Sequence, residues 1–138
     1  FNNNITLEKS HTLDSGYDLQ ADIEHTLHLP PGDYILIPTG ITIEPPKNID
    51  SQVRPRSGLA INNGITVLNT PGTIDSGFRG EIKVILINHG KNIFTIIPGM
   101  KIAQLVFSKS LDTNTILLEN HETLSETYRG QSGFGSTD

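Results

Sequence analysis

The sequence predicts an all-β domain, a barrel or sandwich of short strands. Apolar, β-branched segments recur along the chain, at residues 34–37, 41–43, 82–87, 93–97 and 102–107. Turn-forming sequences separate them: Pro30-Pro31-Gly32-Asp33, Pro45-Pro46-Lys47-Asn48, Asn88-His89-Gly90 and Pro98-Gly99. The 13 glycines and 8 prolines disfavour long helices. The chain contains no repeat or linker, so we expect one domain over residues 1–138.

One short helix and a flexible tail complete the expected elements. The helix is expected at residues 57–63, where Ser57 can cap its start and Gly64 can stop it in a left-handed conformation. Apolar periodicity ends near Glu126, so we expect residues 126–138 to form a flexible C-terminal tail. Phe134, between two glycines, is unusual for such a tail and is suited to stacking on a base.

Composition argues against several classes of protein. The chain carries 10 Lys plus Arg against 15 Asp plus Glu, and this charge of −5 is a poor basis for binding nucleic acid. There is no cysteine, and we interpret the 5 scattered histidines as surface or structural residues. No apolar run approaches the ~20 residues of a membrane span. The start of the chain lacks a signal-peptide pattern, so a cytoplasmic location is the default expectation, with a trimmed organelle signal left open.

Arg56 lies in the polar segment Arg54-Pro55-Arg56-Ser57-Gly58-Leu59-Ala60. Its guanidinium is a planar fork of donors that suits phosphate, and Ser57 adds a hydroxyl. The amides of residues 57–59 open the expected helix, and a helix N-terminus attracts anions. A capped turn beside a solvated arginine is an equally good interpretation of this segment alone.

Asp75 lies in the longest segment of turn and polar residues, which covers positions 69–82. Pro71-Gly72 and Gly77 provide turns on either side of Asp75, so the segment is a candidate hairpin. A carboxylate presented there can act as a general base for water. Taken in isolation, an aspartate that bonds its own backbone in a turn is the more common case.

Two further segments place a polar residue among apolar ones. Gln104 is the inward polar side chain of a strand within Gly99-Met100-Lys101-Ile102-Ala103-Gln104-Leu105, where its amide either serves a ligand or ties strands together. Asp18, within Ser15-Gly16-Tyr17-Asp18-Leu19, is either a carboxylate that holds a metal-bound water or a satisfied turn residue.

Together, these four segments and the tail resemble the five motifs of the trimeric dUTPase family, in the family's order. The most specific matches are Gly72-Thr73-Ile74-Asp75 followed by Phe78-Arg79-Gly80-Glu81, and Gly133-Phe134-Gly135-Ser136-Thr137. The resemblance implies an all-β, jelly-roll-like distorted β-barrel with one short helix, assembled as a homotrimer with a mobile C-terminal tail. Each active site would take motifs one, two and four from one subunit, three from its neighbour and the tail from the third.

The resemblance also implies an activity, the Mg²⁺-dependent hydrolysis of dUTP to dUMP and pyrophosphate by water attack on the α-phosphorus. Such an enzyme removes dUTP from the nucleotide pool and supplies dUMP for dTMP synthesis. Asp75 matches the family's general base, and Asp18 matches a carboxylate that steadies the Mg²⁺ site through water. The matching substrate-binding positions are Arg56, Ser57, Gly58, Asn69, Gly72, Thr73, Ile74, Asp75, Phe78, Lys83, Gln104, Arg129, Phe134 and Gly135.

These positions divide by the part of the nucleotide that the resemblance assigns to them. Residues 56–58 match phosphate contacts, and Gln104 and Arg129 would close around the phosphates. Residues 69 and 72–75 match the hairpin that reads uracil and sugar, Lys83 falls where the family makes a further substrate contact, and Phe134 matches the ring that stacks on the base. A hairpin fitted to uracil leaves the amino group of cytosine facing a donor and leaves no space for the thymine methyl group.

The chain departs from the family pattern at two positions. Phe78 stands where the family usually has Tyr, and Asp138 stands where Gly is usual.

The nearest alternative function is that of dCTP deaminase, on a related fold. That family needs a glutamate where this chain has Ile85. A non-catalytic β module that keeps the fold is the alternative from another class, and the Asp75, Arg56 and Arg129 set argues against it.

Overall fold

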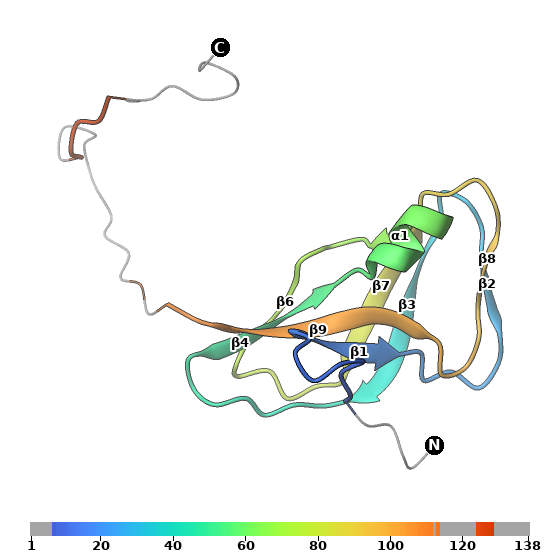
Figure 1. Cartoon of the computed structure of the whole chain (residues 1–138), viewed down its shortest axis with the longest axis horizontal. Helices are drawn as coiled ribbons and strands as arrows, with labels where there is room; N and C mark the ends of the chain where they lie inside the picture. Colours follow the sequence, from blue (N-terminus) through green and yellow to red (C-terminus); the bar gives the residue numbers. More distant parts are fainter. Residues whose placement is uncertain (1–6, 112, 114–123, 129–138) are drawn as a thin grey trace.

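A computed structural model of the chain describes residues 7–111, 113 and 124–128 (Figure 1). Within that part, the chain forms nine strands and one short helix, which has no buried residue. In chain order the elements are β1 (Gly16–Gln20), β2 (Leu27–Leu29), β3 (Tyr34–Ile41), β4 (Ile49–Arg54), α1 (Ser57–Asn63), β5 (Ile65–Val67), β6 (Gly72–Ile74), β7 (Ile82–Asn88), β8 (Phe94–Ile96) and β9 (Lys101–Lys109). The prediction of an all-β chain with one short helix is confirmed.

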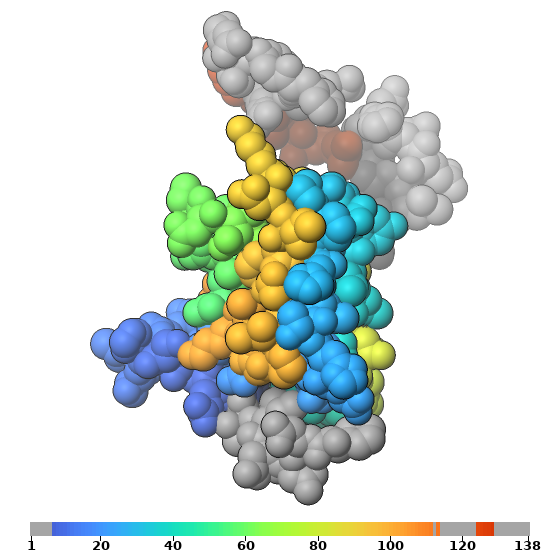
Figure 2. All heavy atoms as spheres, turned by 90° about the vertical axis from the view of Figure 1, so that its right-hand side faces the viewer, coloured from blue at the N-terminus to red at the C-terminus, as the bar shows by residue number. Residues whose placement is uncertain are grey.

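The strands form three antiparallel sheets. One sheet has the order β1-β9-β4-β6, a second has the order β3-β7-β5, and β2 pairs with β8. Figure 2 looks onto the face where β2 and β8 lie side by side. The described strands do not close into a barrel, so the architecture is an open, sandwich-like arrangement. Most neighbouring strands are distant in sequence, and the site therefore depends on long-range pairing.

The core lies between the sheets and follows from alternation along the strands. Successive side chains of a strand point to opposite faces. In β7, Ile82, Val84 and Leu86 are fully buried, whereas the intervening Lys83 is exposed and Ile85 is half-buried. Burying an aliphatic side chain of this size contributes about 1.5–3 kcal/mol relative to exposure. Similar side chains of β1, β2, β3, β4, β5, β8 and β9 belong to the same core.

The short helix has the predicted bounds but not the predicted N-cap. Arg56, with an extended backbone, is the N-cap residue, and no side chain caps the helix by a hydrogen bond. Ser57 is instead the first helical residue, because the chain enters the helix one residue earlier than a Ser57 cap requires. Gly64 stops the helix at φ 71°, as predicted. A side chain there would also place Cβ 2.6 Å from the amide nitrogen of Gly90. Both the positive φ and this close contact therefore require glycine.

Two other expectations need correction. The apolar run at residues 41–43 is not a strand of its own: β3 ends at Ile41, after a register shift that accompanies a positive φ at Gly40. Residues 69–82 do not form a hairpin of two paired strands. β6 pairs with β4 and β7 pairs with β3 and β5, so the segment crosses from one sheet to another. Within the described residues, no helix is long and apolar enough to cross a membrane.

Candidate active site

A cavity of about 460 Å³ opens beside the start of α1. Its size lies within the range of small-molecule sites. Residues from the first, second and fourth predicted segments share its wall: Gly16, Asp18, Arg56, Ser57, Gly58 and Gln104. The loop before β1 adds Ser10 and Asp14. Three segments that are far apart in the sequence therefore meet at one hollow.

Strand register explains why these segments meet. β9 is an inner strand of its sheet, with β1 on one side and β4 on the other. Gln104 in β9 pairs with Asp18 of β1 and with Arg54 of β4. A shift of one residue would turn these side chains to the other face of the sheet. Because β1 and β4 both pair with β9, Asp18 and the segment that contains Arg56 lie on either side of Gln104.

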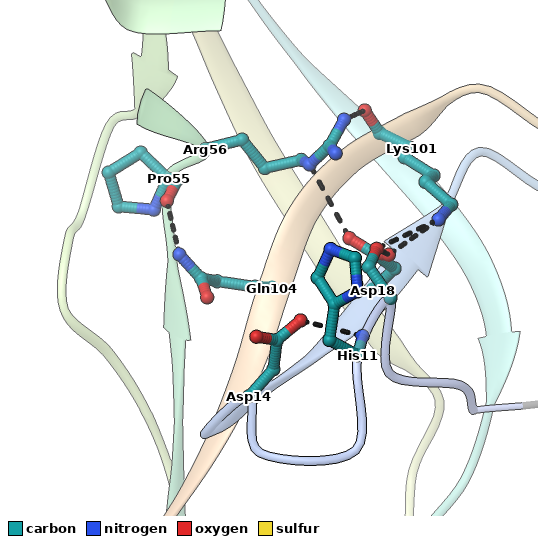
Figure 3. A network of polar contacts seen from close by, with 8 residues as sticks. His11, Asp14, Asp18, Pro55, Arg56, Lys101 and Gln104 are labelled. Atoms are coloured by element: carbon teal, nitrogen blue, oxygen red, sulfur yellow. Dashed lines mark hydrogen bonds and ion pairs between the residues drawn. The ribbon is translucent and has the colours of Figure 1, made fainter. Parts of the chain in front are cut away.

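Asp18 is at the centre of a polar network in the wall of the cavity (Figure 3). Its side chain is only 11% exposed. One carboxylate oxygen lies 2.6 Å from Lys101 Nζ and accepts a 2.8 Å hydrogen bond from the Ser10 hydroxyl. The other oxygen lies 3.4 Å from Arg56 Nε. Two cations and a hydroxyl therefore converge on one carboxylate.

This environment keeps Asp18 ionised. Burial raises the pKa of Asp18, because it disfavours the charged form. The hydrogen bonds from Lys101 and Ser10 lower it, and so do the positive charges of Arg56 and Lys101. Together these contacts outweigh burial, and the pKa of Asp18 lies below its ordinary value of 3.8.

Gln104 and Gly16 form a second fixed point of the wall. The side-chain nitrogen of Gln104 donates a 2.9 Å hydrogen bond to the carbonyl oxygen of Pro55, immediately before Arg56. The amide oxygen of Gln104 lies directly over Gly16, where any Cβ would collide with it. The sequence left two roles open for Gln104, serving a ligand or tying strands together. This contact is an example of the second role. Gly16 is explained by the same packing.

Arg56 is anchored but retains donors for a ligand. One terminal nitrogen, Nη1, donates a 3.1 Å hydrogen bond to the backbone oxygen of Lys101. The side chain is 35% exposed, and the guanidinium has five N–H donors in all. Ser57 and Gly58 are exposed beside it at the start of α1, and a Cβ at Gly58 would meet no atom within 4 Å. This part of the wall is open and presents the Arg56 guanidinium, which suits the binding of an anion.

The third predicted segment lies elsewhere. Gly72, Thr73 and Ile74 form β6, with Gly72 buried against Asn69 and Val53. Asp75 and Phe78 are exposed in the turn that follows, closed by a 3.0 Å hydrogen bond from the amide of Phe78 to the carbonyl of Asp75.

Lys83 lies beyond that turn, on the exposed face of β7. Its ammonium is 3.6 Å from a carboxylate oxygen of Glu81. Neither Asp75, Phe78 nor Lys83 lines the cavity described above.

The order of the strands in the four-stranded sheet explains why Asp75 and Arg56 are far apart. β1 and β6 are the opposite edges of this sheet. Along β4, Ile74 pairs with Ser51 near the start of the strand, whereas Arg56 follows its other end, Arg54. At a strand rise of 3.3–3.4 Å per residue, the stretch from Ser51 to Arg54 alone spans about 10 Å. Asp75 and Arg56 of one chain are therefore too far apart to act on adjacent atoms of one phosphate.

Sequence reasoning missed two contributors, Lys101 and Ser10. Lys101 lies within the segment of residues 99–105, but a lysine at the start of a strand is an ordinary surface residue. Ser10 precedes the first segment and carries no motif. Only the pairing of β1 with β9, including the register shift at Gln20, brings Lys101 to Asp18. Arg129, Phe134 and Gly135, and most of the tail predicted at residues 126–138, lie outside the described residues.

Mg²⁺ can be tested against the groups in the cavity. Among the described residues, no group of three or more His, Cys, Asp or Glu side chains could hold a metal ion. Asp18 is already paired with two cations, which disfavours direct ligation. Mg²⁺ usually keeps several waters and is bound through one or two carboxylates plus substrate phosphates. The cavity therefore fits an ion brought in on a phosphorylated ligand and contacted by Asp18 through water.

Comparison with known proteins gives a consistent result. A family model described as dUTPase matches residues 2–138. The chain is similar to the deoxyuridine 5'-triphosphate nucleotidohydrolase of Gloeothece citriformis, with 58% identity over 127 residues, 92% of this chain and 84% of that protein. The corresponding protein of Clostridium tetani is 52% identical over 128 residues, 93% of this chain and 85% of that protein.

Solved structures give the same picture at the level of fold. A Staphylococcus bacteriophage 80alpha dUTPase variant with dUpNHpp matches with a TM-score of 0.82 and 23% identity, over 99% of this chain and 93% of that chain. EIAV dUTPase matches with a TM-score of 0.71 and 31% identity, over 83% of this chain and 92% of that chain. A dUTPase variant from phage phi11 of S. aureus, with a TM-score of 0.76 and 21% identity over 88% of this chain and 94% of that chain, is described as coordinating a structural Mg(II) ion. These likenesses confirm the jelly-roll-like fold.

Proposed function

The chain belongs to the dUTPase family and therefore hydrolyses dUTP, and we propose that it does so by attack of water on the α-phosphorus, with Asp75 as general base. The products are dUMP and pyrophosphate. The observation that carries the proposal is the division of the site. The cavity gathers the phosphate-binding residues of one chain, whereas the same chain presents Asp75 outside that cavity, in the turn after the opposite edge strand β6.

A divided site calls for assembly, and we propose a homotrimer in which each active site is shared between chains. One chain supplies Asp18, Arg56 and Gln104. A second chain supplies the turn that carries Asp75. An exposed carboxylate with no side-chain contact among the described residues is well placed to meet a ligand held on another subunit. The tail motif at residues 133–137 completes the site from the third chain. Symmetric assembly repeats this arrangement three times.

The phosphate half of the mechanism is positioning and charge neutralisation. Arg56 offers its remaining N–H donors to phosphate oxygens, while Ser57 and Gly58 border the same opening. Gln104 keeps the Arg56 segment in place through its hydrogen bond to Pro55. Arg129 adds a further cation to the phosphates. Holding the triphosphate in line with the attacking water accounts for most of the catalysis in phosphoryl transfer.

The hydrolytic half depends on Asp75. Its carboxylate takes a proton from water as the new bond to the α-phosphorus forms, and the pyrophosphate leaves from the opposite side. Electrons of the breaking P–O bond move onto the pyrophosphate oxygen. Mg²⁺, when bound, compensates the negative charge of the triphosphate, and Asp18 is the residue that would contact its water shell.

Base selection falls to the segment around β6. We propose that Asn69 and the backbone of residues 72–75 read the edge of uracil and the sugar, while Phe78 packs below the sugar and excludes a ribose 2′-hydroxyl. Phe78 is 41% exposed and available for such packing. Lys83 makes a further substrate contact, and Phe134, with Gly135 allowing close approach, stacks on the base.

The test is a comparison of substrates. We expect pyrophosphate release from dUTP, strongly favoured over dCTP, dTTP and UTP, and reduced when Mg²⁺ is chelated. Each nucleotide is incubated with the full chain, and both pyrophosphate and ammonia are measured. Ammonia from dCTP, without pyrophosphate from dUTP, would show a deaminase. Binding of dUTP without any turnover would show a non-catalytic module.

A further inference from the structure

Two residues beside the cavity, Lys101 and Ser10, have no part in the reaction proposed above. The Ser10 hydroxyl donates to Asp18 at 2.8 Å and accepts a hydrogen bond from Lys101 Nζ at 3.3 Å. Lys101 Nζ also lies 2.6 Å from the same carboxylate oxygen of Asp18. The three groups form a closed triangle, and Figure 3 shows its Lys101 and Asp18 members facing each other. They come from β9, from β1 and from the loop before it.

The triangle bears on Arg56 because Arg56 and Lys101 compete for one carboxylate. Lys101 makes the short contact at 2.6 Å, whereas Arg56 Nε remains at 3.4 Å from the other oxygen of Asp18. Arginine and carboxylate otherwise tend to form a two-pronged pair with two parallel hydrogen bonds at about 2.7–2.9 Å. Such a pair would use the N–H groups that phosphate requires.

Lys101 also holds Arg56 directly. Its backbone oxygen accepts a 3.1 Å hydrogen bond from Arg56 Nη1. One residue therefore neutralises the carboxylate with its side chain and orients the guanidinium with its main chain. Asp18 is only 11% exposed, so water screens its attraction for Arg56 incompletely when Lys101 is removed.

We propose that Lys101, supported by Ser10, is a positioning residue that occupies Asp18 and so keeps the guanidinium of Arg56 available for the triphosphate. The inference rests on the proposed function, since it assumes that Arg56 binds phosphate. It assigns Lys101 no contact with the substrate. Its removal acts through Arg56: the arginine closes onto Asp18, and the nucleotide must break that pair in order to bind.

The experiment compares Lys101→Met with Lys101→Arg in the full-length protein. Methionine keeps a long apolar stem and removes the charge, and arginine restores a cation. We expect Lys101→Met to raise the KM for dUTP about tenfold with kcat changed less than threefold, and to weaken dUpNHpp binding by the same factor in calorimetry. Lys101→Arg returns both values to within about threefold of wild type. A Ser10→Ala variant shows a smaller loss in the same direction.

Matched controls separate this inference from a structural effect. Lys109→Met removes a lysine from the other end of β9, where the side chain is exposed, and is expected to leave KM and kcat unchanged. Thermal unfolding is recorded for every variant. A Lys101→Met variant that unfolds at the wild-type temperature, yet binds dUpNHpp as tightly as wild type, overturns the inference. So does a variant that loses kcat instead of KM, because that places Lys101 in the chemical step.

The Arg56→Gln variant distinguishes a failure of the positioning role of Lys101 from a failure of the proposed phosphate site. If Arg56→Gln weakens dUpNHpp binding at least tenfold and Lys101→Met does not, the positioning role is wrong while the phosphate role of Arg56 stands. If Arg56→Gln binds as wild type, the proposed phosphate site itself is wrong.

Discussion

The two edges of the four-stranded sheet differ in how their polar residues are held. At the β1 edge, Asp18 is mostly buried and contacts two cations and a hydroxyl. At the β6 edge, Asp75 and Phe78 are exposed in a turn whose described hydrogen bonds are local. The first edge is organised within one chain. The second, within the part of the chain that the structure describes, exposes its polar groups with few contacts, as the proposed sharing of the site between chains requires.

The largest effect is expected at the exposed edge. Asp75→Asn removes the proposed general base but keeps the size of the side chain and its turn. We expect kcat for pyrophosphate release to fall about 10²- to 10⁴-fold, the usual contribution of a positioned base, while dUpNHpp binding changes less than threefold. Stopped-time assays and calorimetry measure the two quantities. Unchanged turnover would remove Asp75 from the chemistry, and binding lost together with turnover would give it a structural role.

A smaller effect is expected at the β1 edge, where Gly16 packs tightly against Gln104. In Gly16→Ala the new Cβ meets the Gln104 side chain, which must move and give up its contact with Pro55. We expect about 1–3 kcal/mol lower free energy of unfolding, measured by urea titration at fixed protein concentration, and a several-fold higher KM.

Gly77→Ala is the matched control for stability. An added Cβ at Gly77 has no atom within 4 Å, so the free energy of unfolding should stay within about 0.5 kcal/mol of wild type. Equal destabilisation by the two substitutions would contradict the difference between the edges.

The smallest effect concerns acid. The pKa of Asp18 is lower in the folded chain than its ordinary value of 3.8, so its contacts stabilise the fold above that value and lose this contribution as pH falls through the folded pKa. We expect Asp18→Asn to lower stability near pH 7 by no more than about 1 kcal/mol, because the pairs are partly exposed. Urea titrations between pH 7 and pH 3 should show this difference shrinking only below about pH 4. A difference that grows in acid would contradict the assigned contacts.

Sequence reasoning identified the elements better than their connections. The apolar runs that became β7 and β9 and the Gly64 helix stop follow from local patterns. β4, with the polar sequence Ile-Asp-Ser-Gln-Val-Arg, and the three-residue β6 have no such pattern. The Asp18–Lys101 contact depends on strand register, which a single sequence does not specify. The N-cap was misassigned because Arg56, unlike Ser57, has no side-chain oxygen with which to cap a helix.

The division of the active site between chains can be measured by complementation. Asp75→Asn and Arg56→Gln chains are each assayed alone, then unfolded, mixed in equal amounts and refolded together. If each site takes Arg56 from one chain and Asp75 from another, about a quarter of the sites in randomly mixed trimers contain both native residues, and activity should return to about a quarter of the wild-type value. Activity no greater than the sum of the two separately refolded variants would contradict the divided site.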